Sequence, residues 1–218
     1  MTAGARLLLI SGSFEYDSEE SLVILRDYLL ANAPWSCELL VFHSEEDPVS
    51  LEPLESADAV VLFTRRLLTD GAELERFRRY CRDGRPVVGL RTASHAFQRW
   101  LEFDAQVLGG NYDGHFGAGE ITRVSMAEGA ENHPVLEEVE PFEAYGSLYR
   151  NTPLAADTTT LLIGREGEHC EPVAWTCERA GRAFYTSLGH QRDFWELDYL
   201  RLVRNGIAWA LDQASTPR

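Results

Sequence analysis

Apolar runs alternate with amphipathic stretches along the first half of the chain. Residues 18–33 and 70–84 repeat apolar positions at helical spacing, which predicts two α-helices. Four short apolar runs predict β-strands, at residues 6–11, 37–43, 57–64 and 86–91. Strands that are apolar throughout and are joined by helices are typical of a parallel sheet covered on both sides. We therefore predict a doubly wound α/β fold, with helices on both faces of a mainly parallel sheet.

The second half shows a different pattern. Four more strands are predicted, separated by turn-forming residues, at 121–126, 158–164, 172–178 and 182–189. Several of them should be antiparallel and extend one edge of the sheet. Residues 94–104 and 193–213 predict further helices, and the glycine-rich stretch 108–120 lies between strand and helix patterns. The 218 residues contain no repeat or linker, so we predict a single domain over 1–218.

Charge and composition exclude several classes of function. Twenty basic and 35 acidic residues give a net charge of −15, spread along the chain, which opposes nucleic-acid binding. All the basic residues are arginines, so Schiff-base lysines, P-loop lysines and Ser/Lys dyads are excluded. No stretch is apolar enough to cross a membrane, the run LLLI is too short for a signal-peptide core, and the four cysteines form no CxxC pair. We expect a cytoplasmic protein that uses no membrane contact and no cofactor.

Candidate chemistry lies where strands end, because ligands of open α/β sheets bind at the carboxyl ends of the strands. The stretch GLRTASH, residues 89–95, follows a predicted strand in the way that the nucleophile elbow of a hydrolase does. Its tip carries Arg91 and Thr92 in place of a Cys or Ser nucleophile. A forked guanidinium is suited to binding a carboxylate, a phosphate or a polarised oxygen. Ser13, in the loop after the first strand, should lie beside this turn, while Ser94 is expected to cap the next helix.

Three of the six histidines fall in predicted loops or at the ends of elements, namely His95, His115 and His190. A histidine titrates near neutral pH and can act as a general acid or base. Three histidines could also hold a catalytic zinc ion with one open position, although their spacing matches no zinc motif. We predict general acid/base chemistry without a metal and keep the zinc site as the alternative.

Four stretches together resemble those of a known family. They are GLRTASHAF, LGGNYDGH, NHPVLEEVEPFEAYGSLYRN and PVAWTCERAGRAFYTSLGH. In this order the motifs resemble the ThuA-like proteins, named for trehalose utilisation, and the resemblance covers essentially the whole chain. That family belongs to the class I glutamine-amidotransferase-like superfamily, so the resemblance implies a flavodoxin-like fold.

The resemblance also implies roles for individual residues. His190 occupies the place of the superfamily's catalytic histidine, and Tyr149 matches the tyrosine of the HP…LY segment. The elbow of the superfamily holds a catalytic Cys, but this chain has no Cys between 82 and 169 and is not expected to be a glutamine amidotransferase. ThuA-like elbows commonly have His where this chain has Arg91, and His95 could supply an imidazole to the same pocket.

The resulting hypothesis is a protein of carbohydrate metabolism that acts on trehalose, a related disaccharide or a keto-sugar. The expected catalytic residues are His190 and His95. The expected sugar-binding residues are Arg91, Thr92, Ser13, Asn111, His115 and Tyr149. The alternative is a non-catalytic binding or assembly domain that kept the fold after losing its nucleophile. A two-carboxylate glycosidase is less favoured, because no spacing selects a carboxylate pair, and a homodimer is compatible with the apolar helix faces.

Overall fold

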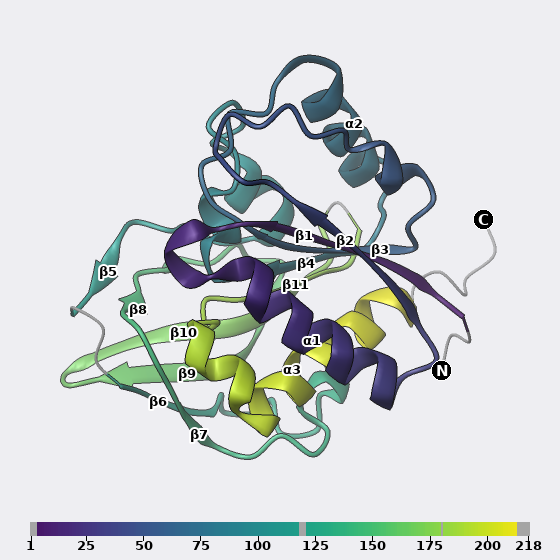
Figure 1. Cartoon of the computed structure of the whole chain (residues 1–218). Helices are drawn as coiled ribbons and strands as arrows, with labels where there is room; N and C mark the ends of the chain where they lie inside the picture. Colours follow the sequence, from purple (N-terminus) through teal and green to yellow (C-terminus); the bar gives the residue numbers. More distant parts are fainter. Residues whose placement is uncertain (1–3, 118–120, 180, 213–218) are drawn as a thin grey trace.

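One nine-stranded sheet forms the centre of the computed structural model, which describes residues 4–117, 121–179 and 181–212 (Figure 1). The strand order is β2-β1-β3-β4-β11-β10-β9-β6-β7. The first five strands pair in parallel and have the flavodoxin-like order, in which the chain reverses direction across the sheet beside β1 and β3. The parallel strands are β1 (Arg6–Gly12), β2 (Ser36–Val41), β3 (Ala59–Thr64), β4 (Val87–Leu90) and β11 (Ala183–Thr186).

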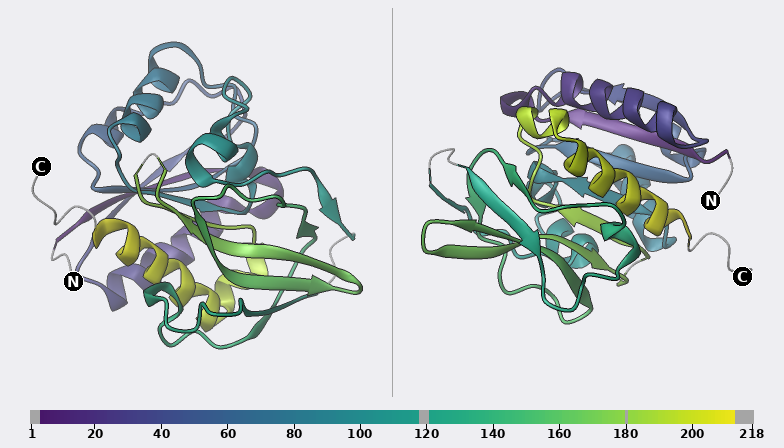
Figure 2. Two further views of the ribbon diagram at one scale, coloured as in Figure 1. Left: turned by 180° about the vertical axis from the view of Figure 1, so that it is seen from behind. Right: turned by 90° about the horizontal axis from the view of Figure 1, so that it is seen from below.

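The remaining strands of this sheet are antiparallel and extend it on the β11 side, as the turn-rich second half predicts. They are β10 (His169–Cys177), β9 (Thr158–Glu166), β6 (Thr122–Met126) and β7 (Phe142–Ala144). A separate two-stranded ladder pairs β5 (His115–Phe116) with β8 (Leu148–Tyr149). This ladder attaches the glycine-rich stretch to the HP…LY segment, at the side of the molecule where β9 and β10 extend (Figures 1 and 2).

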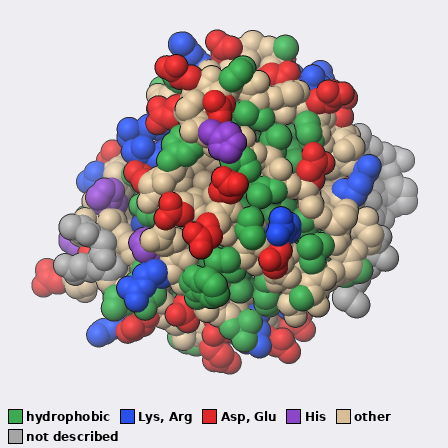
Figure 3. Space-filling view, in the orientation of Figure 1, with side chains coloured by type: hydrophobic (Ala, Val, Ile, Leu, Met, Phe, Trp, Pro, Cys, Tyr) green, Lys and Arg blue, Asp and Glu red, His purple; other side chains and the backbone are tan. Residues whose placement is uncertain are grey.

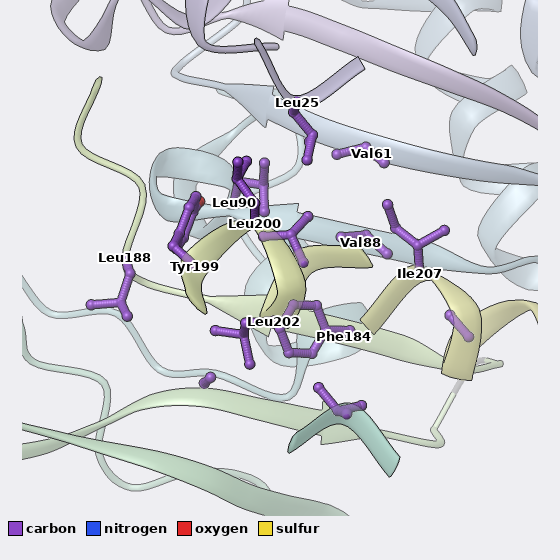
Figure 4. Packing of buried hydrophobic residues seen from close by; sticks show 14 of the residues in the cluster. Leu25, Val61, Val88, Leu90, Phe184, Leu188, Tyr199, Leu200, Leu202 and Ile207 are labelled. Carbon is purple, nitrogen blue, oxygen red and sulfur yellow. The ribbon is translucent and has the colours of Figure 1, made fainter. Parts of the chain in front are cut away.

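Helices cover both faces of the parallel strands, as predicted. Helices α1 (Ser18–Asn32) and α3 (Leu197–Leu211) lie on one face, and α2 (Gly71–Arg82) lies on the other (Figures 1 and 2). Successive residues of β3 alternate between the two cores: Val61 and Phe63 face α1 and α3, whereas Val60 and Leu62 face α2. Figure 4 shows the first of these cores, in which Leu25 and Val61 approach each other and Tyr199 and Ile207 of α3 lie against the sheet.

The prediction of an α-helix over 94–104 is wrong. A short 3₁₀ helix covers Arg91–His95, turns follow, and a π-helical turn covers Asp104–Leu108. Tertiary contacts override the helical periodicity, because Leu67 N–H donates to Ala96 O and Gln98 N–H donates to Leu67 O. These bonds engage a backbone C=O and an N–H group that a continuous helix would need for its own hydrogen bonds. The periodic aromatic residues instead pack as a cluster on the α2 face, formed by Phe97, Trp100, Phe103 and Phe77.

The helix predicted over 193–213 begins later than expected. Residues Gln191–Trp195 form a separate 3₁₀ turn, α3 starts at Leu197, and position 213 lies outside the described residues. The Asp193 carboxylate accepts the N–H groups of Gly189 and His190, which closes this turn before α3 begins. Trp195 in this turn has 74% of its surface exposed, whereas Tyr199 in α3 is fully buried.

Charged side chains of both signs are scattered over the face seen in Figure 3, without a single basic patch on that face. In the described part of the chain, none of the helices combines the length and the apolar character needed to cross a membrane.

The contact between α3 and the sheet gives a stability prediction. Gly206 of α3 lies so close to Phe184 of β11 that a Cβ atom at this position would overlap the aromatic ring. Helix propensity alone favours Gly206→Ala by about 1 kcal/mol, but overpacking a core costs about 1–3 kcal/mol. We expect Gly206→Ala to lower the free energy of unfolding, as measured by urea denaturation.

Phe184→Leu provides the control for this contact. In the double variant the smaller side chain leaves room for the added methyl group, so the two substitutions together should cost less than the sum of each alone. Strict additivity would show that the two residues do not press on each other.

Candidate functional site

The predicted elbow is present at the carboxyl end of β4, and its tip is strained. Arg91 has a φ of 42°, in the left-handed region that residues with a side chain rarely adopt. The Tyr185 hydroxyl donates to Arg91 O at 2.6 Å and holds the turn in place. Backbone strain of this kind persists only when the surroundings enforce it, and it is typical of functional sites.

The side chain of Arg91 lies in the interior, with only 1% of the residue exposed. Its Nη1 donates to Ser187 O at 3.0 Å, and Nη2 lies 3.5 Å from Ser147 O. The guanidinium carbon is 4.5 Å from the ring centre of Tyr16 and 4.9 Å from that of Tyr149, so the cation contacts both aromatic rings. The guanidinium of Arg91 therefore packs against two tyrosine rings. Direct contact between Arg91 and a ligand stays a prediction.

Thr92 and Ser13 lie side by side, as expected, but both are fully buried. The Thr92 hydroxyl donates to Ser13 Oγ at 3.0 Å, and Ser13 N–H donates to Ser18 Oγ at 2.8 Å. These bonds connect the loop after β1 to the loop after β4 and to the start of α1. Their geometry gives both residues a role in fixing the loops; contact with a sugar remains a prediction for them.

His95 is half-buried and lies against two tyrosines. Its ring stacks on Tyr112, with the ring centres 4.6 Å apart, and lies 6.2 Å from the ring centre of Tyr149. Ser94 does not cap a helix; its hydroxyl lies 3.0 Å from His95 Nδ1. Burial and the positive charges of Arg65, Arg66 and Arg91 lower the pKa of His95 to about 3. The imidazole is therefore neutral at physiological pH.

His190 lies at the start of the 3₁₀ turn after β11. Its Nδ1 accepts the N–H of Arg192 at 3.2 Å, so the neutral ring carries its proton on Nε2. Burial, together with Arg91 and Arg192, lowers the pKa of His190. The ring centre is 6.0 Å from Tyr16 and 6.2 Å from Tyr145. His190 consequently offers an N–H donor at the site.

The glycine-rich stretch meets the elbow at Tyr149. The ring centre of Tyr112 is 4.6 Å from that of Tyr149, and His115 in β5 is 6.5 Å from it. Asn111 is exposed, and its side-chain N–H donates to Thr152 O at 3.3 Å. The structure thus gathers His95, His115 and Arg91 around Tyr149; positions 118–120 of the stretch lie outside the described residues. Sequence reasoning did not single out Tyr16 and Tyr112, which complete the ring cluster.

A buried carboxylate lies behind this cluster. Asp104 Oδ2 accepts the N–H of Tyr112 at 2.8 Å, while Oδ1 has no hydrogen-bond partner among the residues that the structure describes. Burial raises the pKa of Asp104 to about 6. A Cβ atom at Gly110 would overlap this carboxylate, so glycine is required there. Asp104 lines a pocket of about 250 Å³ that also includes Ser94, His95, Asn111 and Tyr112.

The zinc alternative finds no support in the geometry. Within residues 4–117, 121–179 and 181–212, no three His, Cys, Asp or Glu side chains are placed to hold a metal ion. His95 and His190 are instead each occupied by a local hydrogen bond and neighbouring tyrosines.

The sheet order defines an α/β fold like that of glutamine amidotransferases, and in this chain arginine occupies the elbow after β4. The chain belongs to the ThuA family: the model of that family, described as trehalose utilisation, matches residues 6–210. It is similar in structure to a ThuA-like protein from Parabacteroides merdae, with a TM-score of 0.79 and 19% identity over 99% of this chain and 92% of that one.

A ThuA-like protein from Bacteroides uniformis is also similar, with a TM-score of 0.75 and 17% identity over 96% of this chain and 93% of that one. A glutamine amidotransferase from Thermotoga maritima shares the fold, with a TM-score of 0.59 and 17% identity over 95% of this chain and 98% of that one. A comparison with curated proteins gives no match.

The raised pKa of Asp104 gives a prediction about stability and pH. Between pH 3.8, the usual pKa, and about 6, the folded protein binds more protons at this carboxyl than the unfolded chain does. The carboxyl therefore lowers the free energy of unfolding as pH rises through that window, by about 3 kcal/mol. Asp104→Asn keeps an oxygen that accepts Tyr112 N–H, and it removes the decrease in unfolding free energy with rising pH because an amide does not titrate.

Urea denaturation at several pH values from about 4 to about 7 measures the effect. The difference in unfolding free energy between the native protein and Asp104→Asn should shift in favour of the variant as pH rises. Asp113→Asn, at a carboxylate whose side chain is 84% exposed, should follow the native curve. If the difference in unfolding free energy between the native protein and Asp104→Asn is constant across pH, the pKa of Asp104 is not raised.

Proposed function

We propose that this protein binds and modifies a small carbohydrate, trehalose or a related disaccharide or keto-sugar, at the cluster of rings over Arg91. The observation that carries the proposal is the gathering of half-buried rings at the carboxyl ends of the parallel strands. They are Tyr16, His95, Tyr112, Tyr145 and His190. Aromatic faces contact the C–H faces of sugars, and neutral N–H and O–H groups bond to hydroxyls. Membership of a family described as trehalose utilisation supports this class of ligand.

The two histidines offer different chemistry in this proposal. His190 donates from Nε2, since its Nδ1 accepts Arg192 N–H. A neutral imidazole N–H can polarise a carbonyl oxygen, such as that of a keto-sugar. The Ser94 hydroxyl lies 3.5 Å from Arg91 O; if it donates there, His95 donates from Nδ1 and keeps Nε2 as an acceptor. His190 then polarises the carbonyl, while Nε2 of His95, whose pKa is lowered to about 3, accepts a hydrogen bond from a sugar hydroxyl.

The second candidate is a binding domain without catalysis, and one observation favours it. The hydroxyls of the elbow are already engaged, because Thr92 donates to Ser13 and Ser94 bonds to His95. With no Cys between 82 and 169, the elbow presents no free nucleophile. Such a domain would bind the same sugars and release them unchanged.

Calorimetric titration with trehalose and 3-keto sugars, combined with product analysis by NMR, tests the proposal. For an enzyme we expect His190→Gln to lower turnover by about 10²–10⁴-fold, because it removes a group that acts on the reacting atoms. Its dissociation constant should change much less. The family-level proposal fails if no sugar of the panel binds, and binding without product selects the second candidate.

His133→Gln is the matched control. Like His190, His133 starts a 3₁₀ turn, accepts a backbone N–H at Nδ1 and has a pKa lowered by burial. It lies against Trp209 of α3, away from the ring cluster. Equal losses of turnover in both variants would point to damage of the fold and would contradict a role for His190 in the chemistry.

A further inference from the structure

The loop after β3 is fixed against the elbow by three backbone bonds. Arg65 N–H donates to Gly12 O at 3.0 Å, Arg66 N–H to His95 O at 2.9 Å, and Leu67 N–H to Ala96 O at 2.7 Å. Arg66 therefore lies directly beside His95. Its φ of 52° is a second left-handed arginine conformation at this edge of the sheet, after that of Arg91. A residue with a side chain is strained in this region, and such strain is typical of functional sites.

Packing does not account for this strained arginine, because its side chain is exposed. In the described part of the chain, the Arg66 side chain forms neither an ion pair nor a hydrogen bond. Its neighbour Arg65 differs, since Arg65 Nε lies 3.0 Å from Glu15 Oε1. The backbone of Arg66 is thus fixed beside His95, and its exposed guanidinium is close enough for its charge to lower the pKa of His95.

Arg66 is one of several arginines near the ring cluster, and it differs from the others in its contacts. Around the rings lie four guanidinium groups, those of Arg65, Arg66, Arg91 and Arg192. The carboxylates near them are Glu15, which pairs with Arg65, and the buried Asp193 and Asp104, which accept backbone N–H groups; Asp17 and Glu20 line a pocket with Arg192. Of the four, Arg66 is the one whose side chain contacts neither a carboxylate nor a ring in the described part of the chain. An unpaired guanidinium beside a candidate binding site attracts anions.

From this arrangement we infer that the sugar bound at the ring cluster carries an anionic group, a phosphate or a carboxylate, and that Arg66 binds it. The inference rests on the proposed function and narrows its substrate class. A guanidinium binds either anion through two parallel N–H bonds, which gives both strength and orientation. The rings would contact the sugar while Arg66 fixes the charged end at the entrance.

Calorimetric titration compares matched neutral and charged probes: trehalose against trehalose 6-phosphate, and glucose against glucuronate. The charged probe of at least one pair should bind about tenfold more tightly at low salt, and this advantage should shrink as ionic strength rises. Arg66→Gln should lower the affinity for that charged probe about fivefold to tenfold and change that of its neutral partner less than about twofold.

Arg204→Gln is the control, because it removes the same charge from α3, where Arg204 bonds to Asn205 and lines a different pocket. It should bind every probe as the native protein does. Equal affinity for charged and neutral probes, or an Arg66→Gln variant that retains the preference, overturns the inference and leaves the carbohydrate proposal standing. If inorganic phosphate binds in an Arg66-dependent way but no sugar does, the anion site stands and the carbohydrate proposal fails.

Discussion

A guanidinium group enclosed between two tyrosine rings is the constraint on which the rest of the site depends. A charge in the protein interior is tolerated only when hydrogen bonds and neighbouring polar groups replace water. For Arg91 these partners come from distant parts of the chain: Ser187 O after β11, Tyr16 after β1 and Tyr149 in β8. The backbone near it is adapted as well, because Gly146 has a φ of 83° and any Cβ atom there would overlap Arg91 Nη2. One buried cation thereby fixes four segments relative to each other.

Much of the fold could be predicted from the sequence, because the decisive signals are local. The strands β1, β3 and β4 are buried on both faces, so each is a nearly continuous apolar run that periodicity detects. The prediction failed over 94–104, where apolar residues at helical spacing fill an aromatic cluster and the backbone bonds to Leu67 instead. Strands β5, β7 and β8 contain only two or three residues and leave no periodic signal.

The convergence of the loops at the candidate site was predictable, and the contacts of their side chains were less so. The rule that ligands lie at the carboxyl ends of parallel strands correctly brought together the elbow, the loop after β1 and the loop after β11. Whether a side chain there points outward or inward depends on partners that are 79 to 96 residues away, as for Thr92 with Ser13 and Arg91 with Ser187. No local sequence pattern indicates which distant residues will form these hydrogen bonds. For the same reason the sequence alone did not identify Tyr16 and Tyr112 as members of the ring cluster.

The two sides of the ring cluster are fixed by different kinds of contact. Asp193 accepts the N–H groups of Tyr145, Gly189 and His190, so the HP…LY segment and the turn after β11 are joined by one buried carboxylate. On the opposite side, Tyr112 N–H donates to Asp104 and the Tyr112 ring lies against those of His95 and Tyr149, while Asp113 N–H donates to Arg150 O. The Tyr112 side is thus fixed by contacts between rings, whereas the His190 side is joined through hydrogen bonds to one buried carboxylate. A ligand that lay against both sides would contact a stacked ring on one and a hydrogen-bonded turn on the other.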